Sequence, residues 1–234
     1  MKVPDLSIVV PFYNEEETVE LLTNTLINEF NKNNIDYELI LVNNGSDDKT
    51  SEIVNKLSEK YKNVKAVHVK VNQGYGWGIL NGLKIANGGY VGYMDGDFEI
   101  QPSGLLNVYK RIKETNADIG KGVRDKRESD TLKAILSVGY DFLFFFLFFR
   151  FIKQVNANPK IMRKICCKKM NLSSKDWFID SEVIIKGLKN NYKIVNQVVS
   201  YVPRKTGESH IKFFDLFSMI IMYLKNTIKY RFGD

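Results

Sequence analysis

Two aspartates, Asp95 and Asp97, are separated by one glycine and directly follow the apolar run Tyr90–Met94. This spacing sends both carboxylates out of a single turn. A pair of carboxylates binds a hard divalent cation through oxygen, and Mg²⁺ or Mn²⁺ on such a pair keeps positions open for diphosphate oxygens. The pair therefore predicts a metal site to which Glu99 could add a third oxygen ligand, with an acidic surface turn as the alternative.

Three more polar clusters follow strand-like apolar runs. The runs are Leu6–Val10, Tyr37–Val42 and Val64–Val69, and the clusters that follow them are Pro11–Glu15, Asn43–Asp48 and Asn72–Gly76. Parallel strands end at one edge of their sheet, and ligands bind in the crevice outside that edge. We therefore expect all four clusters to converge on one site.

Helical stretches must alternate with these strands. Apolar residues recur at helical spacing within residues 15–28, and further helices are expected over residues 48–60 and from residue 77 to residue 85. Fully apolar strands separated by helices indicate a parallel sheet that is covered on both faces. The predicted fold is α/β, with a doubly wound, mostly parallel sheet.

The composition restricts the partners. The chain has 234 residues and a net charge of +7, which suits one large domain and anionic partners. Nucleic acid is the least favoured partner because the basic residues are spread out and no nucleic-acid-binding motif occurs. The adjacent Cys166 and Cys167 suit reduced thiols, and no secretory signal follows Met1, so a cytoplasmic location is expected.

The pattern changes in the second half of the chain. Lys121–Lys133 is charged and loop-like, whereas Gly139–Ile152 is almost wholly apolar, with seven phenylalanines. That run is too short to cross a bilayer as a helix and is expected to be buried or interfacial. Residues 213–232 mix apolar and basic residues, as a basic amphipathic helix at a membrane surface does. We therefore divide the chain into a catalytic domain, 1–212, and a terminal helix, 213–234.

The ordered clusters resemble the successive signatures of the family 2 inverting glycosyltransferases. The matching segments are SIVVPFYNEEETV, LILVNNGSDDKT, NQGYGWGILNGLKIANGGYV and YMDGDFEIQP. Later segments extend the resemblance toward the dolichol- or polyprenyl-phosphate sugar synthases, a group that includes dolichol-phosphate mannose synthase: VNANPKIMRK, WFIDSEVIIKGL and YVPRKTGESHIKF. The resemblance implies a GT-A-like fold, a UDP- or GDP-sugar donor, a polyprenyl or dolichyl phosphate acceptor, and inversion.

The resemblance also implies a donor site built from all four clusters. Its residues are Pro11, Tyr13, Glu15, Asn43, Asn44, Gly74, Asp95, Gly96 and Asp97. The first three would flank the base and ribose, although a plain strand-to-helix turn is the alternative. Asn43 and Asn44 stand where the family usually has two aspartates. An asparagine still offers a donor and an acceptor to a base, so which base is read stays open.

Basic residues provide candidates for binding an acceptor phosphate. Arg204 lies in a segment that resembles the family's Arg-x-x-Gly-x-Ser motif, and an arginine can grip phosphate oxygens bidentately. Lys212, Arg124 and Arg163 are further candidates, with basic surface loops as the alternative. Lys160 is set aside as a solvated lysine.

Asp180 is the candidate general base, because an acid near this position activates the acceptor in many family members. An acceptor phosphate, already ionised, would need little base strength. Placement at a helix N-terminus explains an acid here almost as well.

Two other functions remain open. One is a soluble glycosyltransferase that extends a glycan or polysaccharide. The other is a non-catalytic nucleotide-sugar-binding protein, suggested by the two asparagines. The leading interpretation is a peripheral enzyme on the cytoplasmic face of a membrane, which it would reach by itself or through a membrane-anchoring partner.

Overall fold

The structure is a computed structural model that describes residues 3–125, 131–202 and 213–233. Its strands are β1 (Leu6–Phe12), β2 (Tyr37–Asn43), β3 (Val64–His68), β4 (Tyr90–Tyr93), β5 (Ile119–Arg124), β6 (Lys160–Arg163) and β7 (Ile194–Val199). Its helices are α1 (Val19–Lys32), α2 (Thr50–Lys60), α3 (Tyr75–Ile85), α4 (Pro102–Glu114), α5 (Thr131–Phe148), α6 (Lys164–Met170), α7 (Ile179–Lys189) and α8 (Phe213–Phe232).

The described strands form one seven-stranded sheet in the order β3-β2-β1-β4-β6-β5-β7. Neighbouring strands are parallel except that β6 runs antiparallel to both β4 and β5. The three strands β1, β2 and β4 therefore end at the same edge, as the apolar runs predict. The expected doubly wound, mostly parallel α/β sheet is confirmed.

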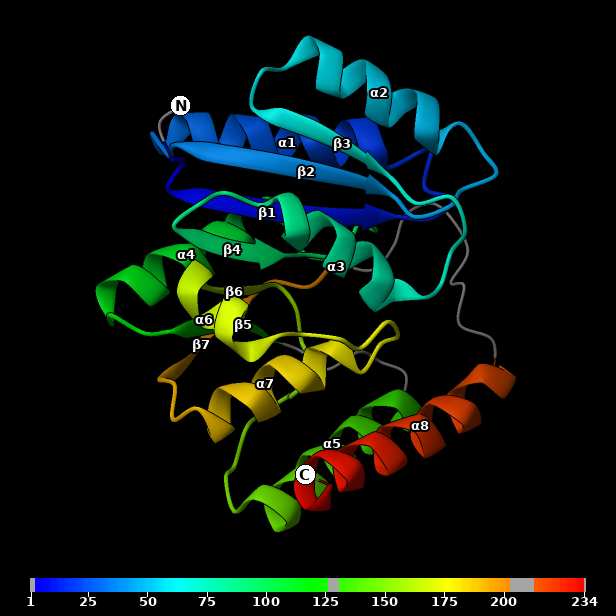
Figure 1. The fold of residues 1–234 in the computed structure, drawn as a ribbon, viewed down its shortest axis with the longest axis vertical. Helices are drawn as coiled ribbons and strands as arrows, with labels where there is room; N and C mark the ends of the chain where they lie inside the picture. The colour runs from blue at the N-terminus through cyan, green and yellow to red at the C-terminus, as the bar shows by residue number, and fades with distance from the viewer. Residues whose placement is uncertain (1–2, 126–130, 203–212, 234) are drawn as a thin grey trace.

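Helices cover the sheet on both faces because successive strand residues point to opposite sides. Ile8 and Val10 pack in the cluster formed with α1, α2 and α4, whereas Val9 packs in the cluster formed with α3, α6 and α7. Helices α5 and α8 form a further layer, which packs on α7 through an aromatic cluster that includes Phe144 and Phe178 (Figure 1). The assignment of 1–212 and 213–234 as separate units stays a prediction.

One segment of the second half differs from expectation. The segment Lys121–Lys133, predicted to be a loop, begins inside β5. The Lys121 side chain is wholly buried there rather than solvated. The apolar run Gly139–Ile152 has both buried and exposed side chains: Phe144 is buried, whereas Phe146 and Phe149 are 67% and 72% exposed. Within the described ranges, no helix is both long and apolar enough to cross a membrane.

Candidate active site

The loops after β1 and β2 are joined to each other and to the acidic turn. The backbone N–H of Asn14 donates to Ser46 Oγ at 3.1 Å, and that of Glu15 donates to Thr50 Oγ1 at 3.0 Å. The hydroxyl of Thr18 donates to the carbonyl of Gly96 at 3.0 Å. These bonds fix the segment that contains Tyr13 and Glu15, both half-buried, beside the turn that carries the two aspartates.

Asn44 follows β2 and connects the end of β1 with the loop after β3. Its Nδ2 donates to the carbonyl of Gly74 at 3.1 Å, and a Cβ added to Gly78 would lie 3.1 Å from both Asn44 Cγ and Pro11 Cβ. The Oδ1 atom of Asn44 is buried, and no group of the described residues hydrogen-bonds to it. Asn43 differs, because its Oδ1 accepts the N–H of Ser46 at 3.1 Å. The structure therefore brings together the residues predicted to bind the nucleotide sugar. Among them, the side-chain oxygen of Asn44 accepts no hydrogen bond from the described residues.

A second loop packs closely against the glycine-rich turn. Gly74 has a φ of +115°, and a Cβ there would lie 2.5 Å from the carbonyl oxygen of Lys175. The rings of Tyr75 and Trp177 stack with centroids 4.3 Å apart. Glycine at this position therefore permits both the backbone conformation and the close approach of residues 174–177.

Asp95 lies half-buried at the end of β4 and is held by side chains from two other segments. Tyr75 Oη donates to Asp95 Oδ1, and Asn158 Nδ2 donates to the same oxygen at 3.1 Å. Desolvation, and then the nearby carboxylate of Asp180, raise the pKa of Asp95 above its ordinary value. Bringing a positive charge to this carboxylate would therefore be favourable.

The other two acids of this turn have different surroundings. Asp97 Oδ1 accepts the backbone N–H of Glu99 at 3.1 Å, and Glu99 Oε2 lies 4.0 Å from Arg124 Nη2. Among the residues that the structure describes, no three His, Cys, Asp or Glu side chains gather into a group that could hold a metal ion. The role of Glu99 as a third metal ligand stays a prediction.

Asp180 lies behind Asp95 and is fully engaged. Its Oδ1 accepts the Tyr93 hydroxyl at 2.8 Å and the Lys160 ammonium at 2.7 Å. Lys160, expected to be solvated, is 0% exposed, and burial lowers its pKa despite the neighbouring Asp180. No periodic pattern predicted the buried pairing of Lys160 with Asp180, because Lys160 lies in a four-residue strand. Its place in the segment VNANPKIMRK, part of the family resemblance, was the only indication.

The basic residues predicted to bind an acceptor phosphate do not all lie at the edge of the sheet where β1, β2 and β4 end. Arg124 is close, since its guanidinium lies 4.5 Å from the ring centre of Tyr201 and near Glu99. Arg163 lies at the far end of β6, where it is paired with Tyr90 in the sheet and donates to the carbonyl of Ala117. The structure therefore does not bring Arg163 to the site. Arg204 and Lys212 lie outside the described residues.

The same fold occurs in a solved glycosyltransferase. Glucosyl-3-phosphoglycerate synthase from Mycobacterium tuberculosis, crystallised with Mn²⁺, uridine diphosphate and phosphoglyceric acid, matches with a TM-score of 0.76 and 16% identity. The match covers 98% of this chain and 79% of that protein. The architecture that carries the amide and carboxylate cluster is thus that of the GT-A glycosyltransferases.

Sequence comparison narrows the class. The glycosyl transferase family 2 model matches residues 7–179, so the chain belongs to that family. A dolichyl-phosphate beta-glucosyltransferase of Trichomonas vaginalis is 28% identical over 246 residues, with 97% of this chain and 74% of that protein covered. A poly(ribitol-phosphate) beta-glucosyltransferase of Bacillus spizizenii is 36% identical over 118 residues, which cover 50% of this chain and 18% of that protein.

Proposed function

We propose that this family 2 glycosyltransferase moves a sugar from a UDP- or GDP-sugar to polyprenyl or dolichyl phosphate, with inversion. The observation that carries the proposal is the convergence of Asn44, Pro11 and Gly74 with the turn Asp95–Asp97 at one edge of the sheet. Amide and apolar groups suit a nucleoside, and carboxylates suit a metal-bound diphosphate. The similarity to a dolichyl-phosphate beta-glucosyltransferase supports the acceptor class.

The nucleoside end would be read by Asn44. Because its Nδ2 donates to the carbonyl of Gly74, the orientation of the amide is fixed and Oδ1 stays available as an acceptor. Uracil and guanine both carry a ring N–H that could donate to it. A buried acceptor without a partner costs about 1–3 kcal/mol, and such a ligand would remove that cost. This reasoning supports UDP and GDP equally.

The diphosphate end would use Asp95 and Asp97. These residues fit Mg²⁺ or Mn²⁺, because a cation held by one or two carboxylates commonly completes its coordination with phosphate oxygens. When bound, the cation would neutralise the charge that builds on the departing nucleoside diphosphate. Tyr75 and Asn158 orient Asp95 by donating hydrogen bonds to it. Arg124 is close enough to the turn to attract the acceptor phosphate.

The state of Asp180 favours a phosphate acceptor over a sugar hydroxyl. A general base must reach the proton that it removes. Asp180 is 3% exposed, and its carboxylate already accepts bonds from Tyr93 and Lys160. An acceptor phosphate is ionised near neutral pH and needs no such base. In this proposal Asp180 orients its neighbours.

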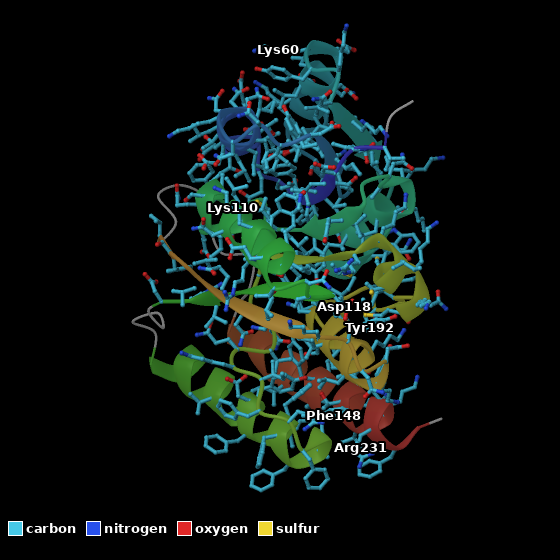
Figure 2. All side chains as sticks on the ribbon, turned by 90° about the vertical axis from the view of Figure 1, so that its left-hand side faces the viewer. Lys60, Lys110, Asp118, Phe148, Tyr192 and Arg231 are labelled. Atoms are coloured by element: carbon cyan, nitrogen blue, oxygen red, sulfur yellow. The ribbon has the colours of Figure 1, made fainter. Side chains whose placement is uncertain are left out.

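A lipid-linked acceptor also requires contact with a membrane, and α5 supplies a suitable surface. Three exposed phenylalanines of α5, Phe142, Phe145 and Phe146, follow the helical spacing i, i+3, i+4 and so form one stripe, and Phe149 is exposed directly after the end of the helix. Ring side chains project from this end of the molecule, away from Lys60 (Figure 2). Exposed apolar residues of α8 lie beside basic ones, Lys225 and Lys229. Aromatic groups flanked by cations suit the interface of an anionic bilayer.

The test is nucleotide release from a panel of UDP- and GDP-sugars, with Mn²⁺ and a short polyprenyl phosphate each present or absent. Release that requires both additions, and that Asp97→Ala abolishes, would support the proposal. Release without lipid would favour a glycan or polymer acceptor, as in the poly(ribitol-phosphate) enzyme. Donor binding without release would favour a nucleotide-sugar-binding protein.

A further inference from the structure

The loop between α5 and β6, residues 153–158, places Asn158 between two carboxylates. Asn158 Nδ2 lies 3.1 Å from Asp95 Oδ1, 3.4 Å from Asp180 Oδ2 and 3.0 Å from Tyr75 Oη. Turning the amide over would set its oxygen against both carboxylates, so the orientation is fixed. Asn158 is 6% exposed, and it is the residue through which Asp95 and Asp180 share one hydrogen-bonded unit.

Buried charges hold this loop from three directions. Lys121 Nζ donates to two backbone carbonyls of the loop, each at 2.9 Å, and Lys160 Nζ donates to a third at 2.9 Å. The Asp141 carboxylate, from α5, accepts two backbone N–H groups of the loop at 2.9 and 3.2 Å. Lys121 and Lys160 are 0% exposed. Burying such groups costs several kcal/mol each, and apolar side chains often fill such volumes at no cost in stability.

We propose that Asn158 is a positioning residue, which holds Asp95 and Asp180 in one arrangement from a loop that Lys121, Asp141 and Lys160 fix in place. This inference rests on the proposed function, because it gives Asp95 a part in binding the metal and diphosphate. Side chains that hydrogen-bond to metal-binding carboxylates typically set metal affinity or activity by about 10–100-fold. Asn158 therefore controls the diphosphate end of the donor site.

The nucleoside end depends on other contacts. Asn44 donates to the carbonyl of Gly74, in the loop after β3, and its backbone N–H donates to Phe12, at the end of β1, whereas the amide of Asn158 bonds to Asp95, Asp180 and Tyr75. Loss of the Asn158 amide should therefore reduce the contribution of the metal to nucleotide binding and leave metal-free binding unchanged. A residue that merely stabilised the fold would affect both.

The experiment is calorimetric titration of UDP, and of GDP in parallel, into the full chain with and without Mn²⁺. The variant is Asn158→Leu, which keeps the branched shape but lacks the amide, and Asn158→Ala replaces it if the leucine variant does not fold. The matched control is Asn156→Leu, the same change in the same loop at a residue whose Oδ1 accepts a bond from Ser181. We expect Mn²⁺ to tighten nucleotide binding at least about tenfold less in the Asn158 variant than in wild type, while the variant keeps the wild-type affinity for nucleotide without metal. The Asn156→Leu control should keep the wild-type kcat.

Three results would overturn the inference. The first is an Asn158 variant that keeps the full effect of Mn²⁺ and the wild-type kcat. The second is an equal loss with and without Mn²⁺, or the same loss in Asn156→Leu, because either would indicate a purely structural role. The third is wild-type protein that binds neither nucleotide more tightly with Mn²⁺, which would remove the proposed function as well.

Discussion

Two asparagines in the site carry buried side-chain oxygens that have no hydrogen-bond partner within residues 3–125, 131–202 and 213–233, Asn44 Oδ1 and Asn158 Oδ1. Buried polar atoms are nearly always paired, so each such atom needs a reason. In both residues the amide nitrogen is committed, to Gly74 and to the carboxylate cluster respectively. Both oxygens are therefore oriented as hydrogen-bond acceptors, and a ligand with N–H or O–H donors would supply the missing hydrogen bonds.

The role of Asn44 can be tested with a change in the ligand. Methylation of the uracil N3 atom removes the N–H that Asn44 Oδ1 would accept. We expect N3-methyl-UDP to bind wild type about 5–150-fold more weakly than UDP, since an unmade buried bond costs about 1–3 kcal/mol. Asn44→Leu should bind both ligands alike, because the acceptor is gone. If calorimetry gives the leucine variant the same preference for UDP as wild type, Asn44 does not read the base.

The buried Lys121 makes stability depend on pH. Burial, and then the nearby Lys160, lower the pKa of Lys121 to about 7, against the usual value of 10.5. Between these values the unfolded chain keeps the proton and the folded protein releases it, so stability rises with pH in this window. The rise is at most about 1.4 kcal/mol per pH unit. We expect urea unfolding to show wild type gaining stability relative to Lys121→Met from about pH 7 to about pH 9. Parallel curves for the two proteins would contradict this prediction.

The sequence predicted those site residues that come from its four ordered clusters, because each cluster follows an apolar run. It set Lys160 aside as solvated and did not single out Asn158; Lys160 lies in β6, which pairs antiparallel with β4, and Asn158 lies two residues before that strand. A local pattern contains no information about that pairing. The prediction that Lys160 is solvated was wrong, because it rested on the usual behaviour of lysine. Its burial is accompanied by an ion pair with Asp180, 20 residues away.

At the scale of elements, the strands with continuous apolar runs were predictable and β5 was not. Its sequence, IGKGVR, contains two glycines and a lysine, yet all but the last residue is buried. The strand depends on tertiary context: Lys121 is satisfied by backbone carbonyls of the 153–158 loop, and a Cβ on Gly122 would lie 2.4 Å from the carbonyl of Asn158. Neither contact can be read from neighbouring residues.

The α5 stripe makes a prediction at this scale. Phe146→Ser with Phe149→Ser removes exposed apolar groups that would enter a bilayer. We expect sedimentation with phospholipid vesicles to fall at least about tenfold, because inserting such side chains contributes about 1.5–3 kcal/mol each. Leu21→Ser with Val71→Ser is the matched control, since those residues are 60% and 67% exposed outside α5 and α8. Equal binding of the two double variants would rule out α5 as the docking helix.

At the scale of the molecule, the described chain separates its tasks along its length. Helix α2 lies at one end and the α5–α8 layer at the other, with the sheet between them (Figure 1). Asp141 belongs to α5 and fixes the loop that carries Asn158. The helix that presents the aromatic stripe is therefore also part of the support for the carboxylates, which would provide a short physical route from the proposed docking surface to the site.

The net charge of +7 adds an electrostatic contribution to docking that depends on where the charges lie. Lys225 and Lys229 are exposed on α8 beside the aromatic end, whereas Lys56 and Lys60 are exposed on α2 at the opposite end (Figure 2 labels Lys60 and Arg231). Because a lysine near an anionic surface contributes about 1 kcal/mol, neutralising the α8 pair with glutamine should weaken binding to anionic vesicles about 30-fold. The same change in the α2 pair should have little effect. Raising the ionic strength from about 0.1 M to about 1 M shortens the Debye length from ~10 Å to ~3 Å and should abolish the difference between the two variants. A difference that survives high salt would mean that these lysines act through something other than charge.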